Sequence, residues 1–148
     1  MTLVRPESTI SVAWRLCDGP RAAAQARRLV HDVLTSVPVS AESVEDVALA
    51  VSELVGNAVL HGEPPIELVL SIDQGGIHAA VVDSGPGSPL MHPTDLEAER
   101  GRGMAIVSDL SLGRFGFCRS PYTTEQGRYG KAVWCTIPTE ILSGAVKR

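Results

Sequence analysis

The strongest constraint on the fold is a pair of short β-type runs that follow directly on a long helical pattern. Residues 66–72 (IELVLSI) and 77–83 (IHAAVVD) are rich in β-branched side chains, and only residues 73–76 (DQGG) separate them. A short, glycine-rich connection is typical of a β-hairpin, because parallel neighbours need a crossover of a dozen or more residues. We therefore expect antiparallel neighbours here, which argues against a doubly wound parallel sheet.

Helical patterns precede this hairpin. Apolar residues recur at helical spacing over residues 21–36. A second and longer helix is predicted from Ser40, a favourable N-cap residue, to His61, with Gly62 as its stop. Its broad apolar face is typical of a helix that lies on a sheet.

The remaining part of the sequence predicts three more strands and one more helix. Residues 9–16 (TISVAWRL) predict a first strand, residues 104–112 a short helix, and residues 114–120 and 131–138 two closing strands. Residues 84–103 are rich in glycine, proline and charge and predict a long loop. The order favours an α+β fold, a two-layer sandwich with helices packed on one face of a mostly antiparallel sheet.

Length and composition limit the classes of function. A chain of 148 residues with 44% hydrophobic and 20% charged residues predicts one globular domain over residues 1–148, with its core at about 9–138 and a frayed tail at 143–148. The net charge of −4 argues against direct nucleic-acid binding. The chain begins without a signal-peptide pattern and contains no long apolar run, so we expect a cytoplasmic protein that does not enter a membrane.

The common catalytic and structural motifs do not occur in this sequence. It contains no GxxxxGK[ST], HExxH or GxSxG pattern, and the GxG of residues 101–103 does not follow a strand directly. The three cysteines form no CxxC pair, which argues against a disulfide framework and against a cysteine-based zinc site. Dinucleotide-binding and P-loop chemistry are therefore not expected.

Three polar residues lie along one stripe of the long helix. Glu53, Asn57 and His61 are spaced four apart, so their side chains point the same way. The amide oxygen of Asn57 is a ligand type that Mg²⁺ accepts, and Glu53 is placed to take a proton from a nearby hydroxyl or water. Glu53 is otherwise a solvated carboxylate, and His61 is equally well explained as a residue that complements the helix dipole.

Two glycine clusters follow the hairpin. Asp83 ends a buried strand, where its carboxylate can accept a hydrogen bond from an exocyclic amine, and Gly85 and Gly87 let the backbone approach a flat ring. Gly101 and Gly103 precede a helix, whose free amide N–H groups favour a phosphate. Asp83 is alternatively a turn former, and the glycines alternatively serve loop flexibility.

In this order, the three clusters resemble the GHKL (Bergerat-fold) ATPase superfamily. ELVGNAVLHG (53–62) resembles its N box, DSGPG (83–87) its first glycine box, GRGMAIV (101–107) its second, and GKAVWCTIP (130–138) its closing strand. The likeness spans about residues 44–137. Within the superfamily, the short chain and the Glu-x-x-x-Asn-Ala-x-x-His spacing resemble the anti-sigma factor and serine-protein kinase branch, a branch of stand-alone histidine-kinase-like ATPase domains.

The resemblance implies ATP and Mg²⁺ as ligands and assigns roles by position. It makes Asn57 the Mg²⁺ ligand, Glu53 the catalytic base and Asp83 the contact to the adenine amine. It also implies that Gly85 and Gly87 form the turn beside the ring and that Thr136 on the last strand supports the adenine. The phosphates would lie under a lid at residues 88–100, held by Gly101, Arg102, Gly103 and Met104.

The resemblance also implies a regulatory function. It predicts an anti-sigma factor with serine/threonine-protein kinase activity on an anti-sigma-factor antagonist of the STAS type, with a sigma factor as the second partner and a homodimer as a possible assembly. The alternative is a protein-interaction module, with or without nucleotide, that sequesters a partner without phosphotransfer. An ATPase domain that serves a histidine kinase in trans is a third option, which the absence of a dimerisation helix with a phosphoacceptor histidine disfavours.

Overall fold

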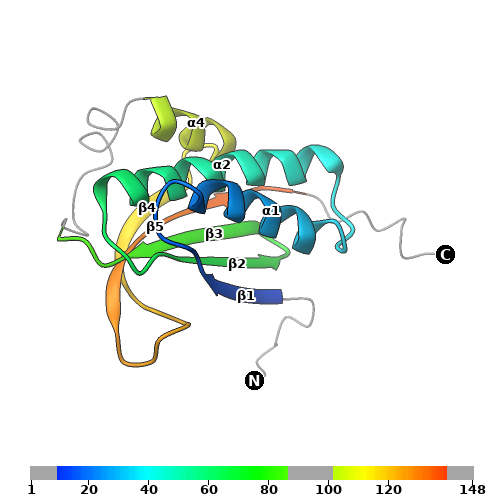
Figure 1. Ribbon diagram of the computed structural model, residues 1–148. Helices are drawn as coiled ribbons and strands as arrows, with labels where there is room; N and C mark the ends of the chain where they lie inside the picture. Colours follow the sequence, from blue (N-terminus) through cyan, green and yellow to red (C-terminus); the bar gives the residue numbers. More distant parts are fainter. Residues whose placement is uncertain (1–9, 87–101, 140–148) are drawn as a thin grey trace, which may run out of the picture.

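The computed structural model of the chain describes residues 10–86 and 102–139, which form one five-stranded sheet and three helices (Figure 1). In chain order the elements are β1 (Ile10–Arg15), α1 (Ala22–Leu34), α2 (Ala41–His61), β2 (Glu67–Asp73), β3 (Gly76–Asp83), α4 (Arg102–Ser111), β4 (Phe115–Pro121) and β5 (Tyr129–Ile137). The element order confirms the predicted one, with bounds shifted by one or two residues at most ends.

All neighbouring strands are antiparallel, and their order in the sheet is β1-β2-β3-β5-β4. The predicted hairpin is confirmed, but its turn is tighter than expected: Asp73 pairs with Gly76, so only Gln74 and Gly75 lie outside the strands. Gly76 has a φ of +130°, and a Cβ there would lie 2.5 Å from the carbonyl oxygen of Ile137. Glycine is therefore required where the hairpin passes the end of β5.

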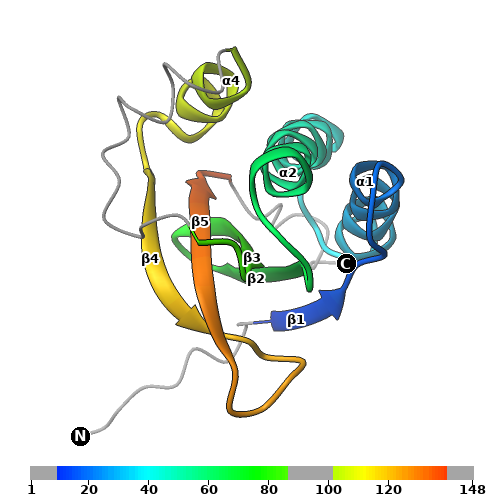
Figure 2. The same cartoon turned by 60° about the vertical axis from the view of Figure 1, so that its left-hand side comes forward.

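The helices cover one face of the sheet, which confirms the predicted α+β architecture (Figure 2). Because side chains alternate along a strand, each strand contributes every second residue to this face. The buried residues of β3 and β5 on this face are Ile77, Ala79, Val81, Cys135 and Ile137. They pack with the apolar side of α2, whose buried residues include Val47, Val51, Leu54 and Val55.

Helix α2 begins and ends as the sequence predicts. The Ser40 side chain accepts a hydrogen bond from the Ser43 backbone N–H at 3.0 Å, a standard N-cap contact. The helix ends at His61, and Gly62 follows with a φ of −107°, a value open to any residue. The backbone angle therefore does not explain this glycine, whose importance lies in what it touches.

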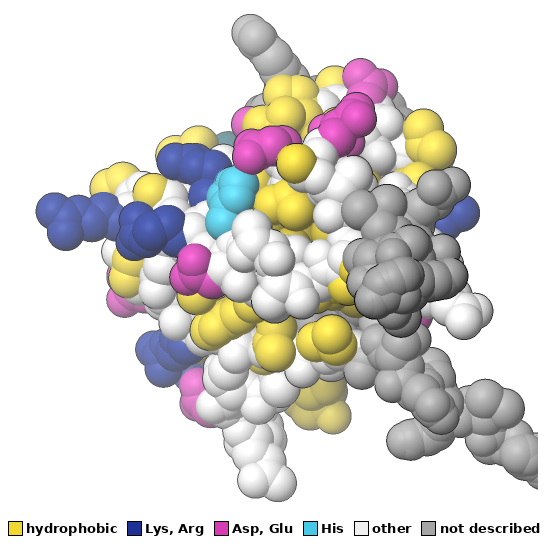
Figure 3. All heavy atoms as spheres, turned by 90° about the vertical axis from the view of Figure 1, so that its right-hand side faces the viewer, with side chains coloured by type: hydrophobic (Ala, Val, Ile, Leu, Met, Phe, Trp, Pro, Cys, Tyr) yellow, Lys and Arg dark blue, Asp and Glu magenta, His cyan; other side chains and the backbone are white. Residues whose placement is uncertain are grey.

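Charged side chains, both acidic and basic, lie on the side of the molecule where α2 begins (Figure 3). Glu45 in the first part of α2 pairs with His31 of α1, with 3.6 Å between the carboxylate oxygen and the ring nitrogen. The polar stripe of Glu53 and Asn57 belongs to the opposite half of the same helix.

Several predicted features lie outside the described residues: Gly87, Gly101, the lid at residues 88–100 and the tail at 143–148. Within residues 10–86 and 102–139, no helix is long and apolar enough to cross a membrane.

Candidate functional site

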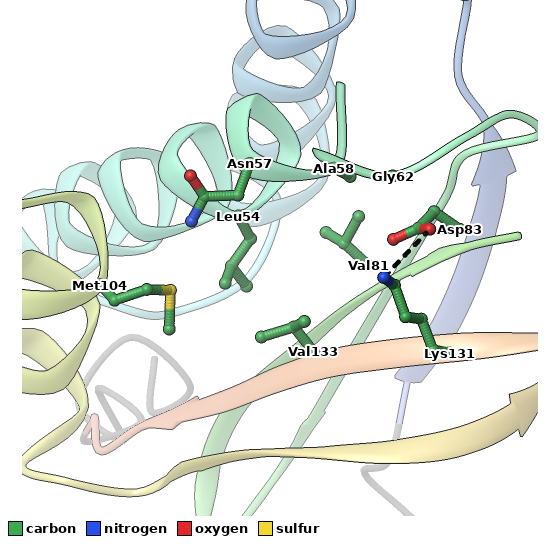
Figure 4. Close-up of a pocket in the computed structure, with 9 residues that line it drawn as sticks. All are labelled: Leu54, Asn57, Ala58, Gly62, Val81, Asp83, Met104, Lys131 and Val133. Carbon is green, nitrogen blue, oxygen red and sulfur yellow. Dashed lines mark ion pairs between the residues drawn. The ribbon is translucent and has the colours of Figure 1, made fainter. Parts of the chain in front are cut away.

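A pocket that opens to solvent lies between α2, α4 and strands β3 and β5 (Figure 4). Apolar side chains form much of its wall, and three polar side chains join them from α2, β3 and β5. The lining residues are Leu54, Asn57, Ala58, Gly62, Val81, Asp83, Met104, Lys131 and Val133. An apolar pocket with a few polar groups is the usual form of a small-molecule site.

Asp83 is held at the end of β3 by backbone donors. Its residue is only 3% exposed, and Oδ1 accepts hydrogen bonds from the Gly85 N–H at 2.7 Å and from the Glu63 N–H at 3.4 Å. A Cβ on Gly62 would collide with the Asp83 carboxylate, which explains the glycine that follows α2. The orientation of this carboxylate is therefore fixed by its surroundings.

The predicted turn after Asp83 is explained by packing within the protein. A Cβ on Gly85 would lie 2.9 Å from the Cα of Gly62 and 3.1 Å from the backbone nitrogen of Glu63. The end of β3 thus lies against the residues that follow α2. Glycine is required at position 85 even without a ring beside it.

Glu53 and Asn57 lie beside the first turn of α4. A Cβ on Gly103 would lie 2.7 Å from Glu53 Oε1 and 3.9 Å from Asn57 Nδ2. The structure therefore brings together three residues that the sequence analysis took from two separate motifs. Met104, the next residue of α4, is fully buried and lines the pocket, and Arg102 begins the helix.

The Asn57 amide is an unsatisfied polar group. Its Nδ2 atom is buried, and it has no hydrogen-bond partner among the described residues. Leaving a buried donor without a partner costs roughly 1–3 kcal/mol, and such exceptions in folded proteins call for an explanation. A bound polar ligand supplies one. Because rotation by about 180° exchanges the amide oxygen and nitrogen, the same side chain can present an oxygen to a cation.

The donor set fits ATP with Mg²⁺. The Asn57 amide provides an oxygen ligand of the type that Mg²⁺ prefers, and Asp83 provides a fixed acceptor for an amine. Gly103 lies in the first turn of a ten-residue helix, and the N–H groups at a helix start favour phosphate. Within residues 10–86 and 102–139, no cluster of three or more His, Cys, Asp or Glu side chains could hold a metal by itself.

Thr136 is not part of this site, contrary to the sequence prediction. It pairs with His78 in the β3–β5 register, and its hydroxyl lies 2.9 Å from His78 Nδ1. The neighbouring Cys135 and Ile137 face the helices, so Thr136 points to the opposite face of the sheet. A support for a base in the pocket cannot come from there.

The residue that β5 does place in the pocket is Lys131, which the sequence analysis missed. It pairs with Asp83 in the sheet, its side chain is 13% exposed, and its Nζ lies 3.9 Å from Asp83 Oδ1. Figure 4 shows both side chains at the same end of the pocket. The alternation of side chains along a strand could have identified Lys131. Lys131, Val133 and Cys135 are spaced two apart and face the same side of the sheet, whereas Thr136 faces the other side.

A second polar cluster, also missed, supports this end of the sheet. Glu67 is completely buried, and its carboxylate accepts hydrogen bonds from the Thr123 N–H, the Thr124 N–H and the Thr124 hydroxyl at 2.7–2.9 Å. The neighbouring Tyr122 hydroxyl donates to the Pro65 carbonyl at 2.7 Å. Together they hold the β4–β5 loop against the start of β2.

His61 lies apart from the polar groups of the pocket. It is exposed in the last turn of α2 and is not among the pocket residues. This position agrees with the interpretation that it complements the helix dipole.

Comparison with known families agrees with this geometry. The family model described as histidine kinase-like ATPase domain matches residues 18–112, which is more than half of the chain. The matched region contains Glu53, Asn57, Asp83 and Gly103, whereas Lys131 lies beyond it. No curated protein shows significant sequence similarity to the chain.

Proposed function

Because this chain belongs to the family of histidine kinase-like ATPase domains, we propose that it binds ATP with Mg²⁺ in the pocket between α2 and the sheet. We propose further that it is a cytoplasmic regulator of the partner-switching type. In this role it is an anti-sigma factor that phosphorylates a serine or threonine on a STAS-type antagonist. The sigma factor is its other partner.

One observation carries the proposal: Glu53 and Asn57 lie together against Gly103, and the buried Nδ2 atom of Asn57 lacks a partner among the described residues. A carboxylate, an amide oxygen and the N–H groups of a helix start are groups that phosphoryl transfer uses. No structural role within the described fold accounts for a polar amide left unsatisfied at this place.

Each polar group of the pocket binds a different part of the nucleotide. The Asp83 carboxylate accepts a hydrogen bond from the exocyclic amine of the base. The hydrogen bonds that it accepts from the Gly85 and Glu63 N–H groups keep it oriented for this contact. Asn57 holds the cation, and the first turn of α4 at Gly103 lies beside the phosphates. When bound, Mg²⁺ would neutralise negative charge on the phosphates.

Glu53 serves the transfer step. Its carboxylate takes the proton from the hydroxyl of the antagonist as the hydroxyl oxygen forms a bond to the γ-phosphorus. The bond from the γ-phosphorus to the bridging oxygen breaks, and ADP leaves with that electron pair. The products are a phosphorylated antagonist, ADP and a protonated carboxylate that returns its proton to water.

Calorimetry tests the binding step. We expect Mg²⁺-dependent ATP binding by the native chain. Binding should be weaker in Asp83→Asn, which removes a carboxylate oxygen that faces the base, and in Asn57→Ala, which removes the cation ligand. If the native chain does not bind ATP with Mg²⁺ present, the proposal is wrong, and a scaffold that acts by contact alone replaces it.

A phosphotransfer assay tests the catalytic step. The chain, ATP labelled at the γ-phosphate and purified STAS-type antagonist domains are incubated together, and phosphoserine is followed. Glu53→Ala should abolish transfer while ATP binding persists. The matched control is Glu45→Ala, which removes an exposed carboxylate near the other end of α2. ATP binding without transfer to any antagonist would favour the sequestering module instead.

A further inference from the structure

Lys131 places a cation where the pocket already contains a fixed carboxylate. Its side chain comes from β5 and that of Asp83 from β3, and the sheet register sets the two residues opposite each other. Both side chains are mostly buried, at 13% and 4% exposure. The pair therefore forms one polar corner in a wall that is otherwise largely apolar.

The ion pair with Asp83 uses none of the N–H donors of the ammonium. The distance of 3.9 Å from Nζ to Asp83 Oδ1 is too long for a hydrogen bond. A lysine ammonium has three N–H donors, which remain available to an acceptor that enters the pocket. Charge neutralisation of Asp83 alone would not satisfy these donors.

A carboxylate beside an ammonium matches one type of heterocycle edge. The 6-aminopurine ring presents an amine donor at position 6 directly beside an acceptor, the ring nitrogen N1. A 6-oxopurine held in the same orientation presents an acceptor to the carboxylate and a donor to the ammonium, and both contacts are then repulsive.

We propose that Lys131 is a specificity-determining residue that recognises the base together with Asp83. Its ammonium donates a hydrogen bond to N1 of adenine, while Asp83 accepts from the amine at position 6. This inference depends on the proposed nucleotide function and deepens it. It gives the base two direct protein contacts from two strands, and it assigns a role to a residue outside the matched part of the chain.

The test removes N1 from the ligand and not from the protein. The probe is 1-deaza-ATP, in which a C–H group replaces N1, compared with ATP by calorimetry in the presence of Mg²⁺. For the native chain we expect about tenfold weaker binding of 1-deaza-ATP, which corresponds to the loss of one hydrogen bond to a charged group. GTP should bind more weakly than either.

The same comparison with Lys131→Met separates recognition from charge neutralisation. If Lys131 contacts N1, this variant binds ATP and 1-deaza-ATP with equal affinity. The control is Arg119→Met, which removes an exposed cation that pairs with Lys131 in the β4–β5 register and stacks on Tyr129. The control should keep the tenfold preference for ATP.

The outcomes distinguish the two proposals. Equal binding of ATP and 1-deaza-ATP by the native chain overturns the recognition role and leaves ATP binding intact. So does a Lys131→Met variant that weakens both ligands by the same factor, because the lysine then acts through Asp83 alone. Binding of GTP as tight as that of ATP has the same meaning. Failure to bind any of the three nucleotides refutes the nucleotide function itself.

Discussion

Glu53 and Gly103 are in such close contact that a Cβ on Gly103 would lie 2.7 Å from Glu53 Oε1. The atom in the way is the far end of a flexible side chain, so the carboxylate can move aside at small cost. Residue 103 thus determines where the Glu53 carboxylate lies, without determining whether the chain folds.

The first prediction concerns this contact. Gly103→Ala should fold with a midpoint of thermal unfolding at or above the native one, because alanine is the better helix former. It should lose most phosphotransfer, because the methyl group displaces the Glu53 carboxylate. Gly56→Ala is the comparison: a Cβ there meets nothing within 4 Å, and the free energy of unfolding should rise by about 1 kcal/mol. Unchanged transfer by Gly103→Ala would contradict the assignment of Glu53.

The second prediction is that function and stability oppose each other at Asn57. Asn57→Ala removes a buried amide nitrogen that has no partner among the described residues, and alanine is favoured in helices. The free energy of unfolding without nucleotide should therefore increase by about 1 kcal/mol, while ATP binding weakens. Urea unfolding with and without Mg²⁺ and ATP measures both effects. A clear loss of stability without nucleotide would mean that the amide has a structural partner.

The third prediction concerns the buried carboxylate of Glu67. It accepts three hydrogen bonds from Thr123 and Thr124, so Glu67→Ala leaves two backbone N–H groups without their partner. We expect a loss of about 3 kcal/mol in the free energy of unfolding. Glu125→Ala is the control, since its 3.4 Å pair with Arg128 is largely exposed and should contribute at most about 0.5 kcal/mol. Similar losses of stability in the two variants would contradict the stabilising role of the hydrogen bonds to Glu67.

The fourth prediction is a pH dependence that comes from Asp73. The hydrogen bond from His78 is the main cause that lowers the pKa of Asp73 below its ordinary value of 3.8. A carboxyl whose pKa is lower in the folded state contributes stability above its unfolded pKa and loses it as the pH falls through the folded pKa. The native chain should therefore exceed Asp73→Asn in stability near pH 5, and the difference should shrink below about pH 4. A difference that is constant down to pH 2, measured by thermal unfolding, would contradict this.

The fifth prediction concerns thiol reactivity. Burial raises the pKa of the Cys135 thiol to about 12, whereas Cys17 and Cys118 are exposed. Because the thiolate is the reactive form, a disulfide reagent at neutral pH should modify Cys17 and Cys118 quickly and Cys135 only on unfolding. Mass spectrometry of the labelled peptides identifies the sites. Rapid labelling of Cys135 would mean that β5 opens in the native state.

Local signals in the sequence were sufficient for most elements of the fold. Ser40 and Gly62 delimit α2 because capping is a local interaction, and the β2–β3 hairpin follows from its short connection. The position of β5 between β3 and β4 was not predictable in this way. It depends on pairing between strands distant in sequence, for which the chain carries no local signal.

The residues of the candidate site that belong to short sequence motifs were predictable. Those that depend on contacts between distant parts of the chain were not. Glu53, Asn57 and Asp83 were found because each sits in a short pattern of residue types. Glu67 was missed because a glutamate in a strand gives no sign that distant N–H groups will surround it. Thr136 was assigned to the wrong face because the alternation of β5 was not followed to the residue.

The interior position of β5 also affects how the chain folds during synthesis. Among the described strands, β5 leaves the ribosome after the other four, yet both β3 and β4 need it as their partner. A nascent chain that stops before Tyr129 has β1, β2 and β3 paired, β4 without any neighbour, and one edge of β3 open. We expect such chains to be targets of chaperones and proteases, since an open apolar strand edge is a template for aggregation. The five-stranded sheet therefore becomes complete only after β5 has been synthesised.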